Sequence, residues 1–395
     1  MKQKFVWQSA LVAAVVALGL VAQPSVSAAA ELTRAVHEKL QDAQKGSGAA
    51  AVNAAKEALA ASKTANDKET SLRMLFYVAS KASDYRTAMS AAEGLLEGGF
   101  AKSTERLQYS KQVAALAVQL RDYGKANSAY QRYLELRGAG ASEKDYFDAA
   151  QIANISGNYS QVMAFGDKVA ASGRPRSEKL LLLQYSAAGK LGQAGKQRSL
   201  MEELAKRFMK GEYLANMIAI QIKAKGDKSM ILNIYRLAAD HNGLKGQELG
   251  LSYVQDLVSA GAMGEADAFL KKAGLKKDDK VTSLTRQATA FAAEEKKGLA
   301  TKDKESRAGK NGETDYRVAM AYFGQGQYSE AAEAARRALQ PDHAARVKRI
   351  DEVQMLLGMA LVRSKKGAEA RGPLSDAKKD PRMAPAADLW LAAAQ

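Results

Sequence analysis

The sequence predicts an all-α protein, a right-handed α-solenoid of about eight or nine helix-turn-helix units. Composition is the first reason: 77 of the 395 residues are Ala, the best helix former, and only 6 are Pro, the strongest helix breaker. The second reason is a polar–aromatic pair that recurs along the chain, each time after apolar residues at helical spacing. Its four clear copies are Asp84-Tyr85, Asp122-Tyr123, Asn158-Tyr159 and Gln327-Tyr328.

The N-terminal segment 1–28 has the pattern of a secretory signal peptide. A short positive start and an apolar run from Ala10 to Ala22 precede small residues that suit a signal peptidase, so cleavage is expected near Ala28 to Ala30. An exported chain of this kind is expected in the periplasm. The alternative is an uncleaved signal anchor in the inner membrane, although this apolar run is shorter than the roughly 20 apolar residues of a spanning helix.

Residues 29–65 are expected to form a helical hairpin, split by the Gly-Ser-Gly at 46–48, that caps the N-terminal end of the solenoid. Residues 66–298 are expected to form a degenerate part of the solenoid. The first two intervals between the polar–aromatic pairs are 38 and 36 residues, and the 169 residues from Tyr159 to Tyr328 divide into five steps of about 34. The repeat length therefore stays nearly constant even where single copies are weak.

In each unit the residue types suit two helices joined by a tight turn. Gly157 and Gly326 are expected to end first helices, because Gly readily adopts the left-handed conformation that follows a helix C-terminus. Asp84, Asp122 and Asn158 are expected to cap the N-termini of the second helices, because their side chains can accept a hydrogen bond from the first turn.

One copy departs from this pattern near residues 281–309. Its first half has good helical periodicity, but the chain then turns polar at 294–297. Residues 299–312 are expected to form a polar, solvated loop, because Lys, Asp, Glu and Gly leave no apolar periodicity there. A frayed second helix is the alternative.

The segment 316–339 is the best copy of the unit. Small side chains at Ala331 and Gly358 are expected where two helix axes approach closely. Residues 313–395 are therefore expected to form C-terminal units that end in a capping helix over residues 384–394.

These units resemble tetratricopeptide repeats (TPRs), and the resemblance extends over roughly residues 66–395. It implies pairs of antiparallel helices whose first members line a concave groove. In this family the groove binds peptide segments, with Asn, Lys and Arg holding the peptide backbone or its carboxylates. The candidate groove residues are Arg73, Tyr77, Lys81, Lys111, Gln119, Asn154, Asn216, Lys223, Tyr316, Met320, Phe323, Met359 and Arg363.

No catalytic residue, cofactor or metal is expected. Cysteine is absent and the 3 His are far apart in the sequence, which leaves little material for a metal site or a nucleophile. Gly195-Lys196-Gln197 lacks the glycine spacing and the hydroxyl residue of a phosphate-binding loop. Glu305-Ser306 has no domain of the lytic transglycosylase kind around it. The chain is therefore not expected to be an enzyme.

The charge indicates the kind of partner. The formal net charge is +16, and it is +14 without the segment 1–28, which holds two Lys and no acid. A basic protein of the periplasm attracts anionic surfaces. The expected partner is a protein or peptide segment, and an acidic one is among the candidates; an anionic glycan or a membrane surface is the alternative, and nucleic acid is disfavoured by location.

Two functions fit these expectations. The favoured one is a non-catalytic periplasmic scaffold for protein–protein interaction that uses the concave surface of the solenoid. The alternative is an accessory module of polysaccharide or peptidoglycan machinery that binds an acidic polymer.

Overall fold

The computed structural model describes residues 32–395, and every regular element in that range is a helix. The predicted all-α fold of stacked, TPR-like helix pairs is confirmed. The expected signal peptide lies outside the described residues. Among residues 32–395, no helix combines the length and the apolar composition that crossing a membrane requires.

The chain divides into two compact units between Ala194 and Gly195. The helices of the N-terminal unit are α2 (Arg34–Lys45), α3 (Gly48–Ala61), α4 (Ala65–Lys81), α5 (Tyr85–Glu97), α6 (Ser103–Gln119), α7 (Tyr123–Arg137), η1 (Gly138–Gly140), α8 (Glu143–Ile155), α9 (Tyr159–Ala171) and α10 (Glu178–Lys190). Those of the C-terminal unit are α11 (Ala194–Phe208), α12 (Gly211–Lys223), α13 (Lys228–Asp240), α14 (Gln247–Ser259), α15 (Met263–Lys272), α16 (Asp279–Gly309), α17 (Gly312–Gly324), α18 (Tyr328–Ala338), α19 (Pro341–Ala344), α20 (Ile350–Arg363), α21 (Gly367–Ala377) and α22 (Ala384–Ala393).

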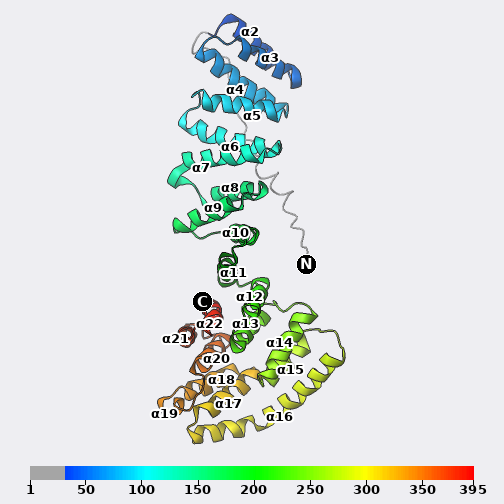
Figure 1. Cartoon of the computed structure of the whole chain (residues 1–395), viewed down its shortest axis with the longest axis vertical. Coiled ribbons are helices and arrows are strands. Elements are labelled where there is room, and N and C mark those ends of the chain that lie inside the picture. Colours follow the sequence, from blue (N-terminus) through cyan, green and yellow to red (C-terminus); the bar gives the residue numbers. More distant parts are fainter. Residues whose placement is uncertain (1–31) are drawn as a thin grey trace. The chain divides into compact units, whose positions relative to one another are not determined.

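The N-terminal unit is a stack of helix pairs. α2 packs on α3, α4 on α5, α6 on α7 and α8 on α9, and each pair also contacts the next (Figure 1). Much of the buried surface between them is Ala, for example Ala79, Ala88, Ala114 and Ala126, each fully buried. Small side chains let the helix axes approach closely, which is why an Ala-rich sequence suits this stack.

The turn inside each pair repeats a backbone conformation. One residue of positive φ follows the first helix, and the next helix begins two or three residues later. The predicted left-handed conformations of Gly157 and Gly326 are confirmed, both with φ 75°. The positions of this turn follow the repeat of the sequence, and they are Ser83, Arg121, Gly157, Gly192, Lys225, Gly261, Gly326 and Lys365.

The predicted N-caps are also confirmed. Asp84, Asp122 and Asn158 accept hydrogen bonds from backbone N–H groups three residues later, at 3.1, 3.0 and 3.3 Å. Each bond satisfies one of the N–H groups that a helix start leaves without an intrahelical partner.

The repeating turn is missing between Gly261 and Gly326, where α16 runs as one 31-residue helix. The polar loop expected at residues 299–312 is therefore wrong for residues 299–309. Glu and Lys at 294–297 are good helix formers, so nothing ends the helix after its first half. Leu299, Asp303 and Ser306 are buried on one face of this helix, and Asp303 and Ser306 bond to Arg337 of α18 and Asp315 of α17.

The last helix does more than cap a free end. α22 packs against α13 and α20, so the end of the C-terminal unit returns to its beginning (Figure 1). Trp390 is fully buried there, and its Nε1 donates a hydrogen bond to the carbonyl oxygen of Asn233 at 2.8 Å. Asp388 pairs with Lys206 of α11 at 2.8 Å and with Lys378 at 2.7 Å. The C-terminal unit thus closes on itself.

Gly358→Ala is expected to lower the free energy of unfolding by about 1–3 kcal/mol. The predicted close approach is confirmed, because a Cβ atom at Gly358 would collide with the Leu374 side chain across the α20–α21 contact. Urea denaturation followed by circular dichroism measures the change.

The matched control is Gly372→Ala in α21, where a new Cβ atom meets nothing within 4 Å. This variant is expected to change the free energy of unfolding by less than about 1 kcal/mol, because the helix preference of Ala over Gly is opposed by the restriction that Pro373 places on the residue before it. Equal stability of the two variants would contradict the packing of α20 on α21.

Candidate functional site

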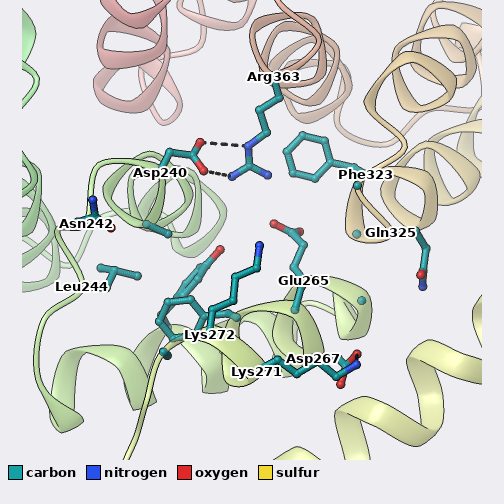
Figure 2. Close-up of a pocket in the computed structure, with 18 of the residues that line it drawn as sticks. Asp240, Asn242, Leu244, Glu265, Asp267, Lys271, Lys272, Phe323, Gln325 and Arg363 are labelled. Carbon is teal, nitrogen blue, oxygen red and sulfur yellow. Dashed lines mark hydrogen bonds and ion pairs between the residues drawn. The ribbon is translucent and has the colours of Figure 1, made fainter.

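A cavity of about 1150 Å³ opens in the C-terminal unit, and we call it the C-terminal cavity. Its lining comes from the end of α13, from α14 and α15, from the turn between α17 and α18, and from the end of α20 (Figure 2). The closure of the unit brings the ends of α13 and α20 together. The volume exceeds the roughly 300–1,000 Å³ of most small-molecule pockets.

Arg363 lies at one end of this cavity in a fixed position. Its guanidinium forms two hydrogen bonds to the Asp240 carboxylate, both 3.1 Å long (Figure 2). The same group lies over the rings of Phe323 and Tyr328, 4.7 and 5.3 Å from their centroids. Burial lowers the pKa of Arg363, but Asp240 and Glu265 outweigh burial and hold this pKa above its usual value. Arg363 is therefore a permanent cation with its orientation set by Asp240.

A second ion pair lies beside it in the interior. Arg236 donates to both Glu265 carboxylate oxygens, at 2.9 and 2.6 Å, and to Oδ1 of Asn233 at 2.7 Å. The side chains of Arg236 and Glu265 are only 9% and 8% exposed, so each charge depends on the other. Arg236 also lies 5.4 Å from the centroid of the Phe323 ring.

Aromatic side chains form another part of the lining. The Tyr253 ring stacks on Tyr235 with centroids 5.4 Å apart and meets the edge of Phe269 at 4.9 Å. Burial, together with the nearby Glu265 charge, raises the pKa of Tyr253, so it stays a neutral phenol. This part of the cavity is therefore uncharged and well packed.

The charges of the lining do not balance. Its three carboxylates all have basic partners: Asp240 pairs with Arg363, Glu265 with Arg236, and Asp267 with Lys271 at 2.6 Å. Two further basic residues of the lining, Lys245 and Lys272, are exposed and form no ion pair with any residue in the range 32–395. Figure 2 shows the Lys272 side chain extending toward Glu265 and the Asp240–Arg363 pair. The cavity therefore presents two cations that have no partner in the described part of the chain.

The candidate groove residues of the N-terminal unit do not gather in one site. Arg73 is held by Glu69 at 2.9 Å and by Glu105 at 2.8 Å, and it ties α4 to α6. The Lys111 ammonium lies over the Tyr133 ring, 5.3 Å from its centroid. The remaining four lie half-buried or exposed on α4, α6 and α8: Tyr77, Lys81, Gln119 and Asn154.

Two candidates of the C-terminal unit were wrongly assigned to an open groove. Phe323 and Met359 are each 1% exposed and belong to the core, because the closed unit covers their helices. Tyr316 is half-buried and donates to Glu352 at 3.4 Å, and burial raises its pKa. Met320 is half-buried, while Asn216 and Lys223 are exposed on α12.

Of all thirteen candidates, the structure places only Phe323 and Arg363 in the C-terminal cavity. Asp240, Glu265 and Lys272 are not recognisable as site residues from the sequence. Their partners lie far away along the chain; Asp240 and Arg363, for example, are 123 residues apart. The neighbouring lysines Lys271-Lys272 were the one local signal.

A buried polar cluster on α16 to α19 serves packing. Asp315 is fully buried and accepts hydrogen bonds from Ser306, Arg337 and His343, all at 2.6 Å. Ser306 is 1% exposed and donates to the Asp315 carboxylate, so its hydroxyl is held inside this cluster. Within residues 32–395 no group of three or more His, Asp or Glu side chains is placed to hold a metal ion.

No protein-family model matches the sequence, and no curated protein matches it significantly. Among solved structures, a tetratricopeptide repeat protein from Parabacteroides merdae is 12% identical with a TM-score of 0.30, covering 65% of this chain and 100% of that chain. Naa15/Naa10 bound to HypK-THB is 14% identical with a TM-score of 0.30, over 86% of this chain and 62% of that chain. The apo form of RapI is 13% identical with a TM-score of 0.25, over 77% of this chain and 94% of that chain.

Proposed function

We propose that this protein is a non-catalytic scaffold that binds a protein partner, and that it works in the periplasm. The observation that carries the proposal is the C-terminal cavity, which is larger than most small-molecule pockets and combines aromatic rings with Lys245 and Lys272. The polar groups buried around it, such as the Arg236–Glu265 pair, hold helices together. A large surface that combines aromatic rings with positive charges suits a segment of another protein.

The test is affinity capture from cross-linked envelope fractions with the wild-type chain and with the variant Lys245→Glu/Lys272→Glu. A specific partner should be recovered with the wild type and lost with this variant. The matched control is Lys179→Glu/Lys196→Glu, which reverses two exposed lysines that neither line the cavity nor belong to the candidate groove residues. A partner set that is identical for all three proteins would contradict binding at the cavity.

Location is tested separately. The signal pattern of segment 1–28 supports export, so the mature chain is expected in the periplasmic fraction, with an N-terminus at Ala29 or Glu31. Edman sequencing of the fractionated protein measures this. A chain that starts at Met1 and sediments with membranes would instead support the signal anchor.

The second candidate function is binding of an acidic polymer as part of polysaccharide or peptidoglycan machinery. Lys245 and Lys272 favour it, because they would attract uronate or other anionic groups along a glycan. In that case binding would be mainly electrostatic. It would disappear at about 1 M salt, where the screening length for charges falls to about 3 Å.

A further inference from the structure

We propose that the C-terminal cavity binds an acidic peptide segment in which carboxylates alternate with aromatic or aliphatic side chains. This inference rests on the proposed function and specifies the chemistry of the partner. The two lysines that would recognise it are outside the predicted concave groove, because they come from α15 and the loop between α13 and α14.

Whether the ligand is negative or positive follows from which charged residues of the cavity lining already form ion pairs. Asp240, Glu265 and Asp267 already have basic partners, so none of them is left to bind a cation. Lys245 and Lys272 are left without partners among residues 32–395. A ligand carboxylate would therefore gain two attractive charges, whereas a ligand ammonium would meet an excess of positive charge.

The aromatic part of the lining argues for apolar side chains next to those carboxylates. Phe269 and Tyr328 are half-buried, so part of each ring is open to a ligand, and the ring of Tyr328 faces the guanidinium of Arg363. Aromatic groups of this kind contribute binding free energy when apolar ligand groups cover them. A purely polar polymer would leave this surface uncovered.

The site is also held in place before binding. Arg363 is fixed by its two hydrogen bonds to Asp240 and by the rings around it. Asn242, at the start of the loop that carries Lys245, has a left-handed backbone with φ 54°. The Arg363 end of the cavity would then need little ordering on binding, whereas the exposed side chains of Lys245 and Lys272 would be ordered by the ligand.

The experiment selects phage-displayed random dodecapeptides on the full mature chain. Enriched peptides should be rich in Asp and Glu together with Phe, Tyr or Leu. Measured by fluorescence anisotropy, a labelled enriched peptide should bind Lys245→Glu/Lys272→Glu about tenfold or more weakly than wild type. Lys179→Glu/Lys196→Glu should bind it like wild type.

Two changes in the peptide complete the test. Replacing its acids by Gln, or its apolar residues by Ser, should each weaken binding to the wild type, and replacing its acids by Lys should abolish it. Enrichment without an acidic bias would overturn the proposal, as would no enrichment or unchanged affinity for the cavity variant. A polyuronate that competes with the peptide, and binds equally well, would favour the glycan instead.

Failure of this inference differs from failure of the proposed function. If affinity capture finds a partner that the cavity variant loses, while the selected peptides show no acidic bias, the scaffold function stands and only the ligand chemistry is wrong. If capture finds no partner at the cavity, the function itself fails.

Discussion

Trp390→Ala is expected to open the closed C-terminal unit and to lower its free energy of unfolding by about 3–5 kcal/mol. Trp390 is 0% exposed and is the largest fully buried side chain among the described residues. It joins α22 to α13 through the hydrogen bond from its Nε1 to Asn233, and its ring lies 5.8 Å from the Arg363 guanidinium. Removing it would leave a large void and would remove the hydrogen bond to the Asn233 carbonyl at the same contact.

Hydrogen exchange read by mass spectrometry would locate the effect. Peptides from α13 and α22 should lose protection in Trp390→Ala, while peptides from α4 to α7, in the other compact unit, should not change. The control is Trp390→Phe, which keeps an aromatic ring and loses the hydrogen bond, at an expected cost of about 1–3 kcal/mol. An Ala variant as stable as the wild type would mean that α22 does not close the unit.

Glu265→Ala is the second substitution with a large expected effect, about 3–5 kcal/mol of lost stability. It would leave the Arg236 guanidinium buried without its carboxylate, because the Arg236 side chain is only 9% exposed and its other side-chain acceptor is the neutral Asn233. The loss should appear as a lower urea midpoint.

Two controls separate the buried charge from the mere loss of a side chain. Asp376→Ala breaks an exposed pair with Lys379, whose side chains are 45% and 78% exposed, and should cost at most about 1 kcal/mol. The double variant Arg236→Met/Glu265→Leu should recover much of the lost stability, because no unpaired charge remains. A double variant as unstable as Glu265→Ala would show that packing around the pair matters more than its charge.

These two substitutions also bear on binding, because the cavity depends on closure. Arg363 and Asp240 face each other only when the end of α20 lies beside the end of α13. Trp390→Ala should therefore weaken peptide binding as well as stability, whereas Lys245→Glu/Lys272→Glu should weaken binding alone. The comparison distinguishes residues that build the cavity from residues that would contact its ligand.

The sequence by itself determined the local parts of this protein. The helix pairs, the left-handed turns at Gly157 and Gly326 and the caps at Asp84 and Asp122 follow from residues within one turn of each other. A capping hydrogen bond spans three residues, so the residue types alone indicate where a helix starts. Local propensity also explains the one wrong element: the loop expected at 299–312 was inferred from charge, although Lys and Glu favour a helix.

Only the tertiary structure decided how the C-terminal unit closes and where its cavity lies. Trp390 and Asn233 are 157 residues apart, and Arg363 and Asp240 are 123 apart. A repeat pattern in the sequence describes contacts between neighbouring helices. It does not specify the contact between α13, near the start of the C-terminal unit, and α22 at its end. The repeat pattern therefore predicts Phe323 and Met359 in an open groove, whereas the structure places both in the core. The reason is that burial depends on which distant helix covers a side chain.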